Sequence, residues 1–142
     1  LFANMYLAWE ALSPTMRRML DGLYGEHTAF QGHGRAAAFA DAPDLVTHPV
    51  ARTHPETGKK ALYFHVTKAL GIEGMEQEKV RPFLEDLLSQ SIKPENTLRH
   101  HWQLGDVVML DNRCTMHRAD PEYDMTEERL LWRIILRGDR PV

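Results

Sequence analysis

The sequence predicts an α+β fold, with its helices in separate segments and a β-sandwich or barrel at the carboxyl-terminal end. Two observations carry this prediction. Apolar residues recur at helical spacing near the start of the chain and again over residues 76–92, whereas the last third consists of short apolar runs between turn residues. A length of 142 residues, with 43% hydrophobic and 26% charged residues, fits one globular domain.

The start of the chain predicts two short helices, over residues 3–12 and 14–23. Ser13 is a favoured N-cap between them, and Pro14 is tolerated at the first helical position. Glycines at positions 22 and 25 weaken the end of the second helix. Residues 25–47 are rich in Gly, Ala and His without a clear period, which predicts a loop with at most one helical turn.

The middle of the chain predicts a β-hairpin and then a helix. Residues 50–54 and 60–65 are apolar, β-branched and aromatic, and Pro-Glu-Thr-Gly at 55–58 connects them. Over residues 76–92 one apolar stripe falls at helical spacing, and Pro94 follows as a stop. The stripe consists of Val80, Phe83, Leu84, Leu87, Leu88 and Ile92. We expect it to be a packing face.

The last third of the chain predicts short strands joined by turns and one polar loop. In chain order these are a strand over 97–102, a turn over 104–106, a short buried run over 107–110, a turn over 111–113, a strand over 114–119, a loop over 120–127 and a strand over 129–138.

The final strand carries the strongest indication of a binding site. One of its faces is wholly apolar, whereas Arg129 and Arg133 share the other face with Leu131 and Ile135. If that face meets solvent, the arginines form a solubilising edge; if it is buried, they need anionic partners. A guanidinium fork binds a carboxylate or sulfonate in bidentate fashion. Four residues along a strand span about 13 Å, so a buried face would hold two separate anions. The residues alone leave both readings open.

Charge and hydropathy exclude several classes of function. The net charge of −3, the isoelectric point near 6.2 and the interspersed charges argue against a nucleic-acid binder. No apolar run reaches the roughly 18 residues that a membrane span needs. The single cysteine, Cys114, excludes an intrachain disulfide and a cysteine-rich zinc site, and it fits a reducing cytoplasm. We therefore expect a cytoplasmic protein without nucleic-acid or membrane partners.

The 8 histidines supply candidate metal ligands. His117 lies across a loop from Arg129, and antiparallel pairing of their strands would bring both into one pocket. His54-Pro55-Glu56 has the form of a His-x-carboxylate ligand pair, although a hairpin turn explains it sufficiently. A zinc site made by His54, Glu56 and His117 is an alternative that the residues leave open.

Five blocks of the sequence carry a resemblance to a known family. They are residues 48–63, Gly71-Ile-Glu-Gly-Met75, Trp102-Gln-Leu-Gly-Asp106, Asp111-Asn-Arg-Cys-Thr-Met-His117 and Arg129-Leu-Leu-Trp-Arg133. The chain resembles the C-terminal half of the taurine dioxygenase / 2,4-dichlorophenoxyacetate dioxygenase family almost end to end. The Asp-Asn-Arg-x-x-x-His block followed by two arginines four residues apart is the most specific part.

The resemblance implies a non-haem Fe(II) enzyme that uses 2-oxoglutarate, built on a double-stranded β-helix (jelly roll) core with flanking helices. His117 matches the distal histidine ligand of the iron, and Arg129 matches the arginine that pairs with 2-oxoglutarate. Arg133 matches a second arginine that meets the anionic group of the substrate. His33 and Lys68 fall near positions where taurine dioxygenase-like members carry aromatic substrate contacts, and Lys68 would add a positive charge.

The implied reaction consumes O₂ and 2-oxoglutarate, releases succinate and CO₂, and hydroxylates a small organic anion. The anion would be a sulfonate, a sulfate ester or an aryloxyalkanoate, and taurine itself fits poorly because neither His33 nor Lys68 is aromatic.

The chain departs from the family pattern at the metal. The family's first two iron ligands are a His-x-Asp pair, and no His-x-Asp occurs in residues 1–142. We therefore expect these residues to be the C-terminal part of a single domain, incomplete at its N-terminal side and inactive alone, with self-association left open. The alternative from another class is a non-catalytic jelly-roll module that binds an anion.

Overall fold

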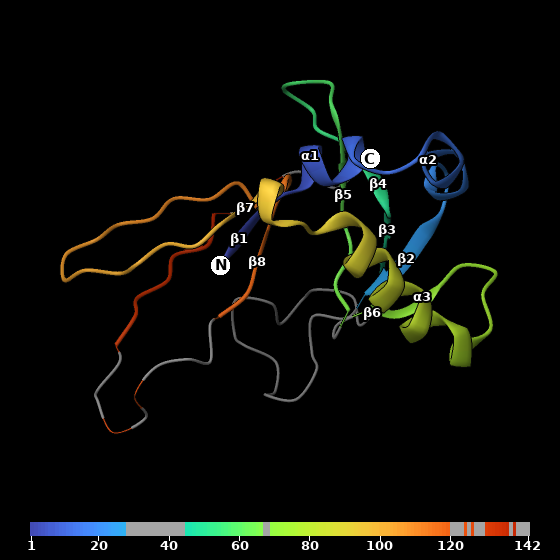
Figure 1. Cartoon of the computed structure of the whole chain (residues 1–142). Helices are drawn as coiled ribbons and strands as arrows, with labels where there is room; N and C mark the ends of the chain where they lie inside the picture. The colour runs from blue at the N-terminus through green and yellow to red at the C-terminus, as the bar shows by residue number, and fades with distance from the viewer. Residues whose placement is uncertain are drawn as a thin grey trace.

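The chain folds into short helices and small antiparallel sheets, as an α+β protein does (Figure 1). The computed structural model describes residues 1–27, 45–66, 69–119, 124, 126, 130–136 and 138. Its helices are α1 (Met5–Glu10), α2 (Pro14–Leu20), α3 (Gln77–Ser91) and the 3₁₀ helix η2 (Pro94–Asn96). Its strands are β1 (Phe2–Asn4), β2 (Tyr24–His27), β3 (Val46–Pro49), β4 (Ala51–Thr53), β5 (Lys60–Leu62), β6 (Ala69–Ile72), β7 (Thr97–Leu98) and β8 (Thr115–His117).

Strand β1 replaces the start of the helix predicted over residues 3–12. It lies between β7 and β8 and pairs antiparallel with both, so that Phe2 is opposite Leu98 on one side and His117 on the other. Asn4 then ends the strand and caps α1, because its Oδ1 accepts hydrogen bonds from the backbone N–H groups of Tyr6 and Leu7 at 3.0 and 3.2 Å. Pairing with residues about a hundred positions away outweighs the local helical pattern here.

Helix α2 begins where the sequence predicts and ends earlier. Ser13 is the N-cap, with its Oγ accepting from the backbone N–H of Met16 at 3.2 Å, and Pro14 is the first helical residue. The helix stops at Leu20 rather than at residue 23, because Gly22 adopts a φ of 85° that no helix accommodates.

The predicted loop over residues 25–47 is wrong at both of its ends. Strand β2 pairs antiparallel with β3, so that Gly25 is opposite His48, and β2 also pairs with β6 on its other side. Gly71 of β6 lets the side chain of Glu26 lie against the backbone where any Cβ would collide with it. Residues 28–44, where a helical turn was allowed, lie outside the described residues.

The predicted hairpin and long helix are confirmed. Strands β4 and β5 pair antiparallel around a turn at residues 55–57, and Gly58 follows with a φ of 68°. Helix α3 spans 15 residues and buries Val80, Leu84 and Leu87 of the predicted stripe. Helix α1 packs on β5, so that Ala8 and Leu62 join the same hydrophobic core.

The carboxyl-terminal third is less regular than the sequence predicts. Strand β7 has two residues instead of six, and residues 99–114 form a long two-armed excursion before β8, here called the β7–β8 excursion (Figure 1). The run over 107–110 is not buried as expected, since Val107 is 90% and Met109 is 93% exposed.

The strand predicted over residues 129–138 is absent from its described part. Residues 130–136 have no regular structure, and every one of them is exposed. A strand needs a hydrogen-bonded neighbour, and the described residues pair no strand with this segment. The alternation of apolar residues is therefore present in the sequence without the pairing that would make a strand of it.

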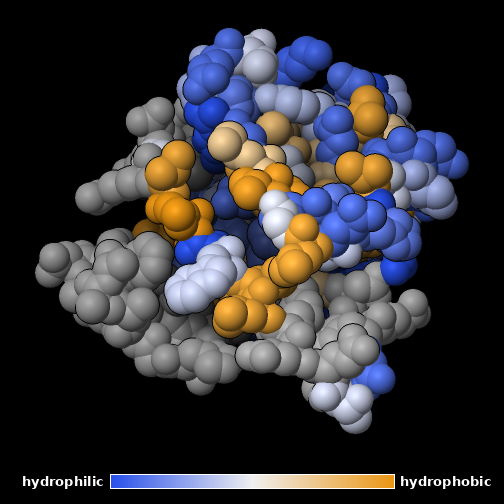
Figure 2. Space-filling view, turned by 90° about the vertical axis from the view of Figure 1, so that its left-hand side faces the viewer, coloured by the Kyte–Doolittle hydropathy of each residue, from blue (hydrophilic) through white to orange (hydrophobic). Residues whose placement is uncertain are grey.

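Exposed apolar side chains are visible on the side of the molecule that carries β1, β7 and β8 (Figure 2). Figure 2 looks onto the side where β1, β7 and β8 lie and shows apolar side chains in the middle of that surface. The large exposed apolar residues of the carboxyl-terminal third are Leu98, Trp102, Leu104, Val107, Met109, Leu130, Leu131, Trp132, Ile134, Ile135 and Leu136. In the described ranges, we find no helix with the length and apolarity that crossing a bilayer requires.

Candidate functional site

His117 stands at the end of β8, directly opposite Phe2 of β1. The two rings lie 6.4 Å apart between centroids, and the imidazole is exposed. Backbone hydrogen bonds between Leu1 and Arg118 hold this end of the two strands together. No described side chain makes a hydrogen bond or ion pair with the ring of His117, so its nitrogens are available to a ligand.

A cavity of about 250 Å³ opens on the face of the three-stranded sheet that carries His117, although His117 itself does not line it. Phe2, Leu98 and Thr115 line it, and these are the residues of the three-stranded sheet that share a face with His117, because side chains alternate along strands. The β7–β8 excursion supplies the other wall with His100, Val108, Met109, Leu110 and Asp111. The sequence pointed to His117 but gave no sign of Phe2 or Leu98, because only the pairing of β1 brings these residues together.

His100 is fixed within this wall. Its Nε2 lies 2.9 Å from Oδ2 of Asp106, and its ring meets that of Trp102 edge-on at 4.8 Å. Asp106 also accepts a hydrogen bond from the backbone N–H of Gln103 at 2.9 Å, which closes the tip of the excursion. Asp106 therefore engages Nε2 of His100 and fixes the orientation of its ring in the cavity wall.

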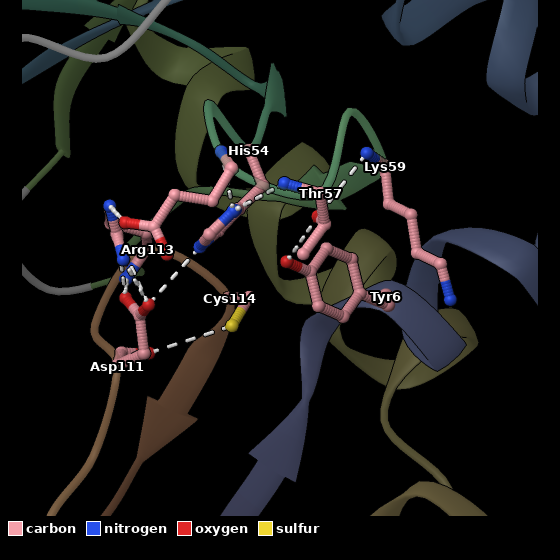
Figure 3. A network of polar contacts seen from close by, with 8 residues as sticks. Tyr6, His54, Thr57, Lys59, Asp111, Arg113 and Cys114 are labelled. Atoms are coloured by element: carbon pink, nitrogen blue, oxygen red, sulfur yellow. Dashed lines mark hydrogen bonds and ion pairs between the residues drawn. The ribbon is translucent and has the colours of Figure 1, made fainter.

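A polar network joins the cavity wall to the β4–β5 hairpin (Figure 3). Arg113 donates from Nη2 and Nε to the carboxylate of Asp111 at 2.7 to 3.0 Å, and from Nη1 to Glu56 at 2.9 Å. The other partner of Asp111 is His54, whose Nε2 lies 3.1 Å from Oδ2. Two segments 57 residues apart in sequence are thus tied at one point.

The electrostatics of this network keep its charges fixed. Hydrogen bonds from Arg113, and then the one from His54, hold the pKa of Asp111 well below its usual range. The carboxylates of Asp111 and then Glu56 raise the pKa of Arg113. Burial raises the pKa of Tyr6, whose hydroxyl lies 3.0 Å from Oγ1 of Thr57. Asp111 is therefore a permanent anion and Arg113 a permanent cation at any pH the protein meets.

His54 is buried and both of its nitrogens are used. Nδ1 accepts from the backbone N–H groups of Glu56 and Thr57, each at 3.3 Å, so Nε2 carries the proton that it donates to Asp111. The spacing of His54 and Glu56, which suggested a ligand pair, belongs to a turn.

The described residues contain one group of side chains at metal-binding spacing, formed by His54, Asp111 and Cys114. Their candidate ligand atoms lie within 4.8 Å of one another. The hydrogen bonds just described already occupy His54 and Asp111, and Cys114 packs against the hydrophobic core. The zinc alternative is not supported, since Glu56 and His117 are not in this group and Glu56 is paired with Arg113.

The other predicted site residues are placed only in part. Arg133 is described and exposed, in a segment without regular structure. Arg129, Lys68 and His33 lie outside the described residues. The arrangement of two anion-binding arginines beside His117 therefore stays a prediction.

The chain matches the family described as taurine catabolism dioxygenase TauD, TfdA family, over residues 1–135. Among curated proteins, the chain is 32% identical to an (S)-phenoxypropionate/alpha-ketoglutarate-dioxygenase from Sphingobium herbicidovorans, over 97% of this chain and 52% of that protein. It is 35% identical to an alpha-ketoglutarate-dependent 2,4-dichlorophenoxyacetate dioxygenase from a Burkholderia species, over 98% of this chain and 48% of that protein.

A solved structure shows the same fold. The crystal structure of AAD-2 in complex with Mn(II) and N-oxalylglycine matches with a TM-score of 0.75 and 31% identity, over 89% of this chain and 52% of that one. The chain thus spans about half the length of the curated relatives it matches.

Proposed function

Because the chain belongs to the TauD/TfdA family, we propose that it is the C-terminal part of a non-haem Fe(II)/2-oxoglutarate-dependent dioxygenase. The whole enzyme would hydroxylate a small organic anion, a sulfonate, a sulfate ester or an aryloxyalkanoate, and release succinate and CO₂. Its core would be a jelly roll, of which residues 1–142 form the C-terminal part.

The observation that carries the proposal is the position of His117. It is an imidazole with unengaged nitrogens, on the sheet face that carries a cavity, in the Asp-Asn-Arg-x-x-x-His block. Neutral imidazole and carboxylate ligands suit Fe(II), and the metal would bind 2-oxoglutarate and activate O₂. Among the described residues, His117 belongs to no group of three or more side chains at metal-binding spacing, so the remaining ligands would come from elsewhere in the protein.

The chain's own residues would hold and orient the reactants. Arg129 would pair with the distal carboxylate of 2-oxoglutarate, and Arg133 with the anionic group of the substrate. Lys68 and His33 would lie near that substrate. Phe2 and Leu98 would give the apolar wall that keeps water from the reacting carbon, since both line the cavity on the sheet face that carries His117.

The network around Asp111 would position His117. Asp111 and Arg113 lie in the same block as His117, and their bonds to His54 and Glu56 fix the start of β8 against the hairpin. Residues that hold a metal ligand in place affect metal affinity without touching the metal.

The test is turnover by the whole protein that contains this chain. Succinate formation would be measured with Fe(II), 2-oxoglutarate, O₂ and a panel of sulfonates, sulfate esters and aryloxyalkanoates. We expect one anion to stimulate turnover, His117→Ala to abolish it, and His101→Ala, at an exposed histidine of the excursion, to leave it unchanged. Anion binding without turnover would favour the non-catalytic module instead. A cytoplasmic location also stays a prediction, supported by the free cysteine Cys114.

A further inference from the structure

Arg52 is a buried cation that the proposed function does not use. Its side chain starts on β4 and is 2% exposed. Both Nε and Nη2 are buried and have no hydrogen-bond partner. Among the described carboxylates, none lies within ion-pair distance of it, whereas Arg113 has two such partners.

The two unpartnered atoms form one edge of the guanidinium. The N–H of Nε and one N–H of Nη2 point the same way, and this pair matches the two oxygens of a carboxylate. Cζ of Arg52 lies over the ring of Tyr63, 5.1 Å from its centroid, and this contact gives no hydrogen bond to Nε or Nη2. Because arginine does not lose its proton in proteins, burial cannot neutralise this edge, and an anion is the partner that would.

Three aromatic rings continue the cluster from Arg52 toward the surface. His48 meets Tyr63 edge-on at 5.5 Å, and His27 lies 5.4 Å from His48 and 6.4 Å from Tyr63. All three rings belong to partly exposed residues, while Arg52 is buried. Burial, and then the nearby His48 and His65, lower the pKa of His27 to about 4, so His27 is neutral at neutral pH.

We propose that the Nε–Nη2 edge of Arg52 binds the carboxylate of a small carboxylic acid, at a site beside the ring of Tyr63, which the rings of His48 and His27 adjoin. The site uses none of His117, Arg129 or Arg133, so it goes beyond the proposed function and does not depend on it.

The experiment follows the Nε–H signal of Arg52 by NMR in the ¹⁵N-labelled whole protein, prepared free of carboxylates. Formate is added at constant ionic strength, with sodium chloride in the parallel series. We expect a saturable downfield shift of this signal toward that of Arg81, whose Nε already donates to Glu85 at 2.8 Å. The pKa of His27 should rise in the same titration, because a neighbouring anion favours the imidazolium form.

Two variants identify the responding residue. Arg52→Lys should remove the shifted signal and the response of His27 to formate. Arg81→Lys, at an exposed arginine, should leave both unchanged. If Arg52→Lys does not fold, the Nε–H signal of Arg52 can be assigned directly in the unmodified protein. The formate titration of that protein then decides whether Arg52 binds the carboxylate.

Two results would overturn the proposal. One is an Nε–H signal of Arg52 that does not move with formate up to saturating concentrations. The other is a signal that already lies at the carboxylate-bound position in carboxylate-free protein, since the edge would then be filled from within the protein. Neither result bears on succinate formation, so the two proposals fail separately.

Discussion

The β4–β5 hairpin and the β7–β8 excursion come from similar apolar sequence patterns but end in different structures. Helix α1 packs on β5, and Ala61 and Leu62 are fully or almost fully buried. In the excursion Leu104, Val107 and Met109 are almost completely exposed. An apolar run becomes a buried strand only where another element covers it, and in the described structure only the hairpin has such a cover.

The largest expected effect on stability comes from truncating a core side chain of the β4–β5 hairpin. Leu62→Ala should lower the free energy of unfolding by about 2–5 kcal/mol, because it leaves a cavity beneath α1. Val107→Ala should change it by less than about 0.5 kcal/mol, because the side chain is exposed. Urea unfolding of the 142-residue chain measures both. Equal losses for the two variants would show that the excursion is covered in solution.

The polar network that ties the two regions together should come next. Arg113→Ala removes charge-assisted hydrogen bonds to Asp111 and Glu56, and we expect it to lower the midpoint of urea unfolding. Arg81→Ala is the matched control, since its ion pair with Glu85 lies on the surface and should lower the midpoint of unfolding less. A loss for Arg113→Ala no greater than for this control would mean that the network does not hold the excursion to the hairpin.

A substitution at the boundary between β1 and α1 should have a smaller effect on stability. Asn4 caps α1 at the point where the sheet of the cavity meets the hairpin core, so Asn4→Ala should cost about 1 kcal/mol. Asn112→Ala, at an exposed turn residue of the excursion, should be close to neutral. Thermal unfolding of both variants would test this, and the prediction fails if the two melt at the same temperature.

A pH dependence gives a further test, with one loss expected from His27 of β2 and a second from Asp111 of the β7–β8 excursion. The folded pKa of His27, about 4, lies below the unfolded value of about 6.5, so the unfolded state binds more protons between these values. Stability is therefore greatest above pH 6.5 and falls as the pH drops toward 4. The lowered pKa of Asp111 adds a second loss, which begins only below about pH 4.

His27→Gln should remove the first loss and keep the second, and Asp111→Asn should do the reverse. Unfolding free energies between pH 3 and 8 would distinguish the two. A slope between pH 6.5 and 4 that survives His27→Gln would assign it to another group.

The sequence predicted part of the candidate site. The Asp-Asn-Arg-x-x-x-His block pointed to His117, and the structure puts this residue opposite Phe2, which lines a cavity on the same sheet face. It did not show that Asp111 and Arg113 bind His54 and Glu56, because partners 57 residues apart leave no local pattern. The sequence indicated only that His54 and Glu56 have the spacing of a ligand pair. In the structure His54 stabilises the hairpin turn and Glu56 pairs with Arg113.

What the sequence alone determined are features that depend on neighbours along the chain: the Ser13 cap and Pro14 start of α2, the hairpin turn before Gly58, and the stripe of α3. Caps, turns and helices form hydrogen bonds within a few residues, so their signals are local. Only the tertiary structure decided that Phe2 begins a strand, that residues 107–110 stay exposed, and that Arg52 is buried with an unpaired edge. Strand pairing and burial depend on segments far apart in sequence, and no local pattern records which of them meet.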